Sequence, residues 1–96
     1  MITDSQKQII LEHMMSINPL KVAIFGSYAR GENKADSDLD ILIYLDYSKK
    51  ISLLDIIGAE LDLSDALGIK VDLVSERSLH PFVRPFVEKD IQFIYQ

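Results

Sequence analysis

Two aspartates two residues apart, Asp38 and Asp40, are the residues of this chain whose type and spacing best suit chemistry. They stand at the start of an apolar run, residues 41–45, with the character of a β-strand. Residues i and i+2 of a strand share one face, so both carboxylates would lie together with their Cα atoms roughly 7 Å apart. Oxygen ligands at this spacing suit two Mg²⁺ or Mn²⁺ ions about 4 Å apart. An isolated Asp-x-Asp is more often a charged guard at a strand edge, so both interpretations stand on the pair alone.

A glycine turn precedes the two aspartates. The segment GSYARG, residues 26–31, follows a second apolar run, residues 22–25, as a tight turn follows a buried strand. If the turn opens a short helix, the amides of Gly26 and Ser27 face an anion with the helix dipole behind them, and Ser27 adds a hydroxyl. Arg30 is equally suited to contact a phosphate or to be a solvated helix charge. Turn and carboxylates together are what a metal-dependent nucleotide-transfer site requires.

The order of these residues resembles a known signature. Gly26-Ser27, a spacer of residues 28–37 and then Asp38-x-Asp40 are similar to the signature of the DNA polymerase beta nucleotidyltransferase superfamily. Within that superfamily, the stretch is most similar to the minimal nucleotidyltransferases, or MNT domains.

The family pattern also requires a third acidic residue on a later strand. Asp72, within the apolar segment 70–75, matches that residue by type and setting. A lone aspartate on a strand is usually structural or exposed, so its catalytic interpretation depends on the resemblance. The resemblance covers residues 9–95, although only the first motif is specific.

The resemblance implies a role for each matching residue. Gly26 and Ser27 would hold a nucleoside triphosphate, and Asp38 and Asp40 would bind two Mg²⁺ ions, with Mn²⁺ as an alternative. Asp72 would help to bind the second ion and take the proton from the attacking hydroxyl. Displacement at the α-phosphorus would then release pyrophosphate.

The pattern of the whole chain predicts an α/β, or two-layer α+β, domain. Helices are expected at residues 4–17, 52–67 and 80–90, and strands at 22–25, 41–45, 69–75 and, as a strand or extended tail, 91–95. Asp4 or Ser5 is expected to cap the first helix. The family adds a short mixed sheet with helices packed on one side and the carboxylates at the open face.

Burial within the later elements is predicted from spacing. In segment 52–67 the apolar residues recur at helical spacing and should face the core, whereas the acidic residues should face solvent. The apolar set is Leu53, Leu54, Ile57, Leu61 and Leu67, and the acidic set is Asp55, Glu60, Asp62 and Asp65. The aromatic residues Phe82, Phe86 and Phe93 are expected in the core rather than as a platform for a nucleobase.

Composition narrows the function further. A chain of 96 residues with 48% hydrophobic content predicts one domain, residues 1–96. It contains no cysteine, so disulfides and thiolate metal sites are excluded. The first residues lack a signal-peptide pattern and no run suits a membrane span, which predicts a cytoplasmic protein. A net charge of −5 argues against direct nucleic-acid binding, and bound metal ions would offset repulsion of a nucleotide.

The acceptor does not follow from the motif. Stand-alone MNT domains resemble the antitoxin half of systems whose other half is a helical HEPN ribonuclease toxin, and the resemblance implies transfer of AMP from ATP to a toxin tyrosine. One alternative is transfer to a small molecule, as in the aminoglycoside nucleotidyltransferases. Another is neutralisation of a toxin by binding alone. Nucleotide preference, the number of nucleotides added and the oligomeric state stay open.

Overall fold

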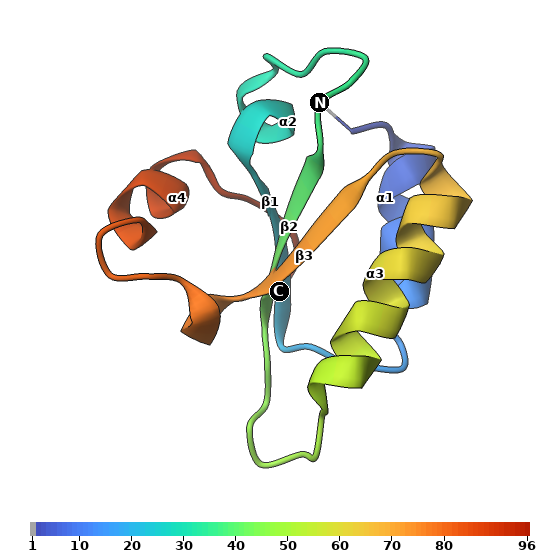
Figure 1. The fold of residues 1–96 in the computed structure, drawn as a ribbon, viewed down its shortest axis with the longest axis vertical. Coiled ribbons are helices and arrows are strands. Elements are labelled where there is room, and N and C mark those ends of the chain that lie inside the picture. The colour runs from blue at the N-terminus through green and yellow to red at the C-terminus, as the bar shows by residue number, and fades with distance from the viewer. Residues whose placement is uncertain (1) are drawn as a thin grey trace.

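A four-stranded mixed sheet forms the centre of the protein in a computed structural model that describes residues 2–96 (Figure 1). The order across the sheet is β3-β2-β1-β4. Strand β1 runs antiparallel to β2 and β4, whereas β2 and β3 are parallel. The strands are β1 Lys21–Phe25, β2 Leu39–Tyr44, β3 Val71–Ser75 and β4 Gln92–Tyr95. The predicted fold class is therefore confirmed, and the last segment is a strand.

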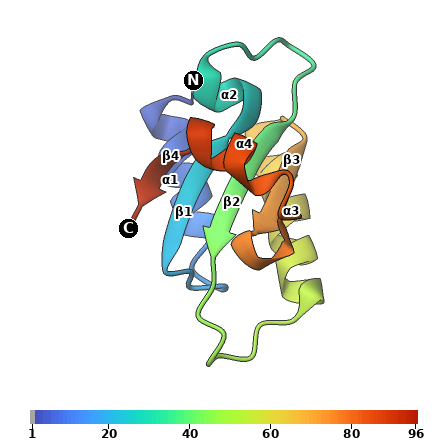
Figure 2. The ribbon, with the colours of Figure 1, turned by 90° about the vertical axis from the view of Figure 1, so that its left-hand side faces the viewer.

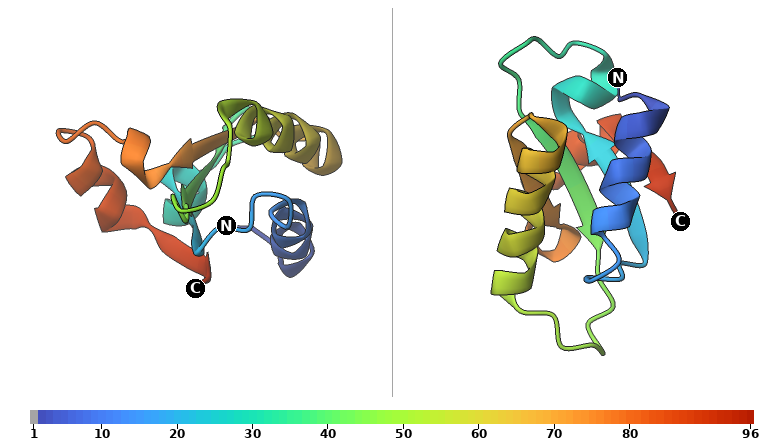
Figure 3. Two further views of the ribbon diagram at one scale, coloured as in Figure 1. Left: turned by 90° about the horizontal axis from the view of Figure 1, so that it is seen from below. Right: turned by 90° about the vertical axis from the view of Figure 1, so that its right-hand side faces the viewer.

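Two helices cover one face of this sheet, α1 Asp4–His13 and α3 Leu53–Leu67 (Figure 3). The cap of α1 is Thr3, whose hydroxyl accepts from the Gln6 amide, so the expected cap at Asp4 or Ser5 was one or two residues late. The helix also ends at His13, earlier than expected. Helix α3 begins after a capping box at Ser52 and ends at Gly68.

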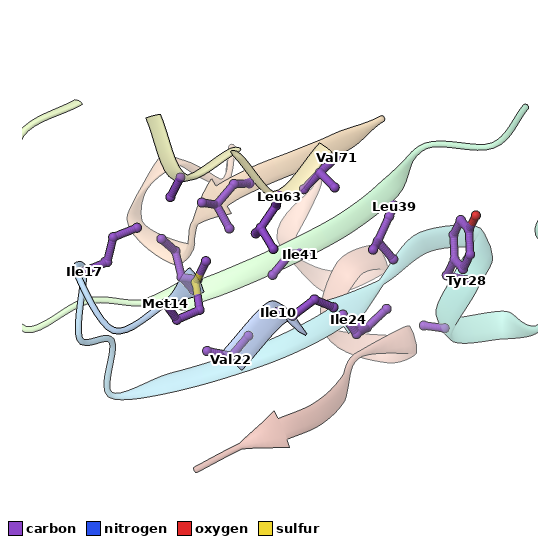
Figure 4. Close-up of a cluster of buried hydrophobic side chains, with 14 of the residues drawn as sticks. Ile10, Met14, Ile17, Val22, Ile24, Tyr28, Leu39, Ile41, Leu63 and Val71 are labelled. Atoms are coloured by element: carbon purple, nitrogen blue, oxygen red, sulfur yellow. The ribbon is translucent and has the colours of Figure 1, made fainter. Parts of the chain in front are cut away.

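The main core lies between these helices and the sheet. Ile10 and Met14 from the α1 segment meet Leu63 of α3 and the inward side chains of β1 and β2, such as Val22 and Ile41 (Figure 4). Ile10, Val22, Ile41 and Leu63 are all fully buried. Leu39, Ile41 and Ile43 alternate along β2 toward this core, which sends Asp40 to the other face of the sheet.

The prediction for the buried face of α3 was wrong for four of its five residues, because only Leu67 is half-buried and packs against the core. Leu54 and Leu61 are 78% and 60% exposed, and Leu53 and Ile57 are also exposed, whereas Ala59 and Leu63 are buried. The cause is the free edge of β3. Glu60 Oε2 accepts the Leu73 amide at 2.8 Å, and Ser64 Oγ accepts the Val71 amide at 3.0 Å.

Because a strand edge buried without partners is costly, these two polar side chains turn inward and set the rotation of the helix. The prediction that Glu60 faces solvent was therefore wrong. Asp62 and Asp65 are exposed as predicted, and Asp55 is exposed while it completes the helix cap.

A short helix covers part of the opposite face of the sheet. Helix α4, Arg84–Asp90, follows the 3-10 turn η1, Glu76–Ser78, and lies in front of β1 and β2 in Figure 2. Val87 packs against Ala23 and Leu42. The expectation that helices pack on one side of the sheet thus holds for α1 and α3 and is corrected for α4.

The prediction that the C-terminal aromatic residues lie in the core was wrong. Phe82 is 82% exposed, Phe86 is 74% exposed and Phe93 is 37% exposed. For Phe86 the reason is the shortness of α4, a seven-residue helix whose one buried residue is Val87. Phe82 precedes this helix, and Phe93 lies in the edge strand β4. Among residues 2–96, no helix combines the length and apolar character needed to cross a membrane.

Candidate functional site

Asp40 and Asp72 lie opposite each other on adjacent strands. The parallel register of β2 and β3 pairs Asp40 with Asp72. Each residue is half-buried between core residues of its strand, which places both carboxylates on the face that also carries α4. The structure therefore brings together two predicted site residues that are far apart in the sequence.

Asp38 directly precedes β2 and belongs to the same alternating row as Asp40. Its carboxylate is partly exposed and forms an ion pair with Lys70, whose Nζ lies 3.6 Å from Asp38 Oδ2. Within residues 2–96, no three acidic, histidine or cysteine side chains are already gathered around one metal position. A metal ion would therefore compete with Lys70 for the Asp38 carboxylate. Nothing in the sequence motif indicated that Lys70 would lie at this position.

Electrostatic crowding is strongest at Asp40. Partial burial, followed by the nearby carboxylates of Asp72 and Asp38, raises the pKa of Asp40 to about 6, while Arg30 acts in the opposite direction. Among residues 2–96 the Asp40 carboxylate accepts no hydrogen bond and forms no ion pair. A half-buried oxygen donor with two acidic neighbours and no partner fits a divalent cation such as Mg²⁺ or Mn²⁺.

Gly26 closes against Asp40 at the end of β1. Its backbone is left-handed, with φ of +73°, and the preceding residue, Phe25, pairs with Asp40 across the sheet. A Cβ atom at Gly26 would overlap the Asp40 carboxylate oxygen and lie 3.2 Å from Cγ. Glycine is thus required twice, by the backbone conformation and by the close approach. Ser27 follows in α2, Gly26–Arg30.

The Arg30 side chain is already paired with two carboxylates, so it is not free to bind a phosphate. Its Nε lies 3.1 Å from Glu32 Oε2, and its Nη1 lies 3.0 Å from Asp90 Oδ2. The hydrogen bonds to Glu32 and Asp90 raise the pKa of Arg30. Arg30 therefore ties α2 to α4, a role that the sequence motif did not reveal because Asp90 lies 60 residues further along the chain.

The sheet, the glycine turn and the paired aspartates together have the arrangement that the sequence led us to expect of a nucleotidyltransferase. A family model described as "Nucleotidyltransferase domain" matches residues 7–94. The chain therefore belongs to the nucleotidyltransferase domain family, which confirms the predicted enzyme class. Membership implies a nucleotide substrate and the use of a divalent metal.

Two similar proteins indicate which kind of nucleotidyltransferase this chain resembles. A protein of Methanocaldococcus jannaschii, provisionally named a protein adenylyltransferase, is 55% identical over 74 residues, which are 76% of this chain and 74% of that protein. A solved structure provisionally described as a minimal nucleotidyltransferase is 36% identical, with a TM-score of 0.78 over 92% of this chain and 88% of the other. The predicted resemblance to minimal nucleotidyltransferases is confirmed.

The same fold also occurs in a toxin–antitoxin complex. The MNT antitoxin solved with a tri-AMPylated HEPN toxin of Shewanella oneidensis has a TM-score of 0.74 over 98% of this chain and 72% of the other. Its identity to this chain is 20%, so this likeness concerns the fold alone.

Proposed function

We propose that this chain is an antitoxin that transfers AMP from ATP to a tyrosine hydroxyl of a helical HEPN toxin. The observation that carries the proposal is the pairing of Asp40 with Asp72 on adjacent strands, with Gly26 closed against Asp40. The name of the Methanocaldococcus relative suggests protein adenylylation, and the HEPN complex of the structural neighbour suggests the kind of partner. The reaction is placed in the cytoplasm, where ATP is available.

Each residue of the site has a role in this proposal. Asp38, Asp40 and Asp72 would hold two Mg²⁺ ions, and Lys70 would give up its ion pair with Asp38 for them. The ions, when bound, neutralise the triphosphate and polarise the α-phosphorus. The backbone at Gly26 and the hydroxyl of Ser27 orient the triphosphate.

Asp72 takes the proton of the tyrosine hydroxyl. The tyrosine oxygen forms a bond to the α-phosphorus while the bond from that phosphorus to the bridging oxygen breaks, and pyrophosphate leaves. Arg30 reaches a phosphate only by releasing Glu32 or Asp90, so its contribution is to orient α2 and α4 in the resting protein.

The test uses the full chain, a HEPN toxin, ATP and Mg²⁺. A neighbouring reading frame that encodes a helical protein with an Arg-x4-6-His motif would identify the toxin to use. Mass spectrometry should find one or more AMP groups on a toxin tyrosine. The toxin should also stay inactive as a ribonuclease after this chain is removed, because a covalent mark outlasts a complex.

The variants Asp38→Asn and Asp40→Asn should fail to protect, whereas Asp36→Asn, at an exposed position of the same loop, should behave as wild type. Protection that survives the first two substitutions would show neutralisation by binding. Modification of an aminoglycoside but not of the toxin would show a small-molecule enzyme.

A further inference from the structure

A pocket of about 400 Å³ lies between α2 and α4 and opens beside the proposed phosphate turn. Phe25 and Gly26 line it on one side, and Phe86 and Val87 of α4 line it on the other. Its volume falls within the range of small-molecule sites. Gly26 lines this pocket and also closes against Asp40, so the pocket lies next to the acidic site.

Phe86 is the feature of the pocket that nothing inside the protein explains. The ring is 74% exposed, although its neighbour on the helix, Val87, is buried against the sheet. No aromatic contact to Phe86 occurs among the described residues, in contrast to Tyr44 and Phe93, whose ring centroids lie 5.8 Å apart. An exposed aromatic ring at the wall of a pocket is a suitable surface for a flat, apolar ligand group.

The charge of the pocket suits a phosphate-bearing ligand. Lys89 lines the pocket and forms no ion pair with any of residues 2–96. The positive charge of Arg30 is already shared between Glu32 and Asp90, which fixes the pocket wall without adding free charge. In a protein of net charge −5, an unpaired lysine in the pocket that Gly26 lines favours the approach of a polyanion.

We propose that this pocket binds the nucleoside end of the nucleoside triphosphate, with the Phe86 ring as the platform for the nucleobase. The proposal rests on the proposed function, because it extends the nucleotide site from Gly26 across to α4. A nucleobase is favoured over an aromatic side chain of the acceptor because the triphosphate-holding turn itself lines the pocket. Phe86 is thus a nucleotide-positioning residue.

The experiment compares two ligands on the full chain by calorimetry in the presence of Mg²⁺. ATP carries a nucleoside, whereas inorganic tripolyphosphate carries the phosphates alone. Phe86→Ala should weaken ATP binding by about tenfold or more, as expected for the loss of one base–aromatic stack, and leave tripolyphosphate binding within about twofold. Phe86→Trp should keep the affinity for ATP.

Phe82→Ala is the matched control. Phe82 is 82% exposed, lies outside the pocket and stacks on His80, with ring centroids 5.3 Å apart. Its replacement should change neither affinity. A circular dichroism melt of each variant separates a lost contact from a lost fold, since an exposed phenylalanine contributes little to stability.

The outcomes separate the two proposals. If Asp40→Asn abolishes Mg²⁺-dependent binding of both ligands but Phe86→Ala alters neither, the proposed function stands and the nucleoside pocket is overturned. The pocket is also overturned if Phe86→Ala weakens both ligands equally, or if it leaves ATP affinity intact and raises the KM for the protein acceptor. If wild type binds neither ligand, the proposed function fails and the pocket fails with it.

Discussion

Replacement of Asp40 by asparagine should stabilise the metal-free protein at neutral pH while it abolishes activity. The folded protein raises the pKa of this carboxyl from 3.8 to about 6, chiefly by partial burial and then by the charges of Asp72 and Asp38. Below pH 3.8 the carboxyl is protonated in both the folded and the unfolded chain. Between pH 3.8 and 6 the unfolded chain loses the proton first, so the free energy of unfolding falls as the pH rises.

The difference between 3.8 and about 6, at 1.36 kcal/mol per pKa unit, gives a ceiling of about 3 kcal/mol. Asp40 is only half-buried, so solvent screening reduces this to about 1–2 kcal/mol. The neutral amide of Asp40→Asn removes that cost at pH 7.5. For a domain of this size, the melting temperature should rise by roughly 5–15 °C.

Thermal and urea unfolding in EDTA at pH 7.5 and pH 4 would measure the effect. The gain of the variant should be present at pH 7.5 and nearly absent at pH 4, where Asp40 itself is protonated. Asp62→Asn, at an exposed position of α3, is the control and should change stability by less than about 0.5 kcal/mol at either pH.

Addition of Mg²⁺ should reverse the order, because ligand binding stabilises only a protein that retains the site. Wild type should gain stability with metal, and the variant should not. A variant that is less stable than wild type at pH 7.5, or one that gains equally at both pH values, would refute the electrostatic account of the site.

Three further predictions test other parts of the structure. Gly26→Ala should abolish transfer, because its Cβ displaces the β2 carboxylate, whereas Gly31→Ala, with a similar φ of +71° and open space around it, should cost only about 1 kcal/mol of stability and leave transfer measurable. Asp72→Asn should lower turnover about 10²-fold or more with little change in ATP affinity, as measured by steady-state kinetics and calorimetry. An equal loss of turnover and ATP affinity would contradict a role in the transition state. Glu60→Ala should destabilise by about 1–3 kcal/mol, because a β3 amide loses its partner, and Leu61→Ala in the same urea titration should not.

The parts of the site that the sequence predicted are those set by local geometry. Asp38 and Asp40 share a strand face because side chains alternate, and Gly26 fits a turn that other residues enter at a cost. Those rules need no knowledge of the tertiary fold. The position of Asp72 opposite Asp40 depends on the strand order, which was not predicted from the sequence. The family pattern supplied only the expectation of a third acidic residue on a later strand.

The errors come from contacts between distant segments. Counting apolar residues placed Leu54 and Leu61 of α3 in the core, because the hydrogen bonds from β3 to Glu60 and Ser64 are not visible in the sequence. Those bonds compete with the burial of leucine, since an unpaired buried amide costs about as much as one exposed aliphatic side chain. The ion pair of Lys70 with Asp38 was missed for the same reason, because the two residues are distant in the sequence.

The exposure of Phe86 was missed for the same reason, because it depends on contacts between distant segments. This exposure also connects the fold to the function. Phe86 was expected in the core because an aromatic side chain buries a large apolar area. Instead Arg30 ties the end of α4 at Asp90 to α2, which leaves a pocket between the two helices rather than a closed contact. Arg30 and Asp90 both line the space in which we place the nucleoside, so their ion pair fixes one wall of that space and Arg30 serves the nucleotide through the position of α4.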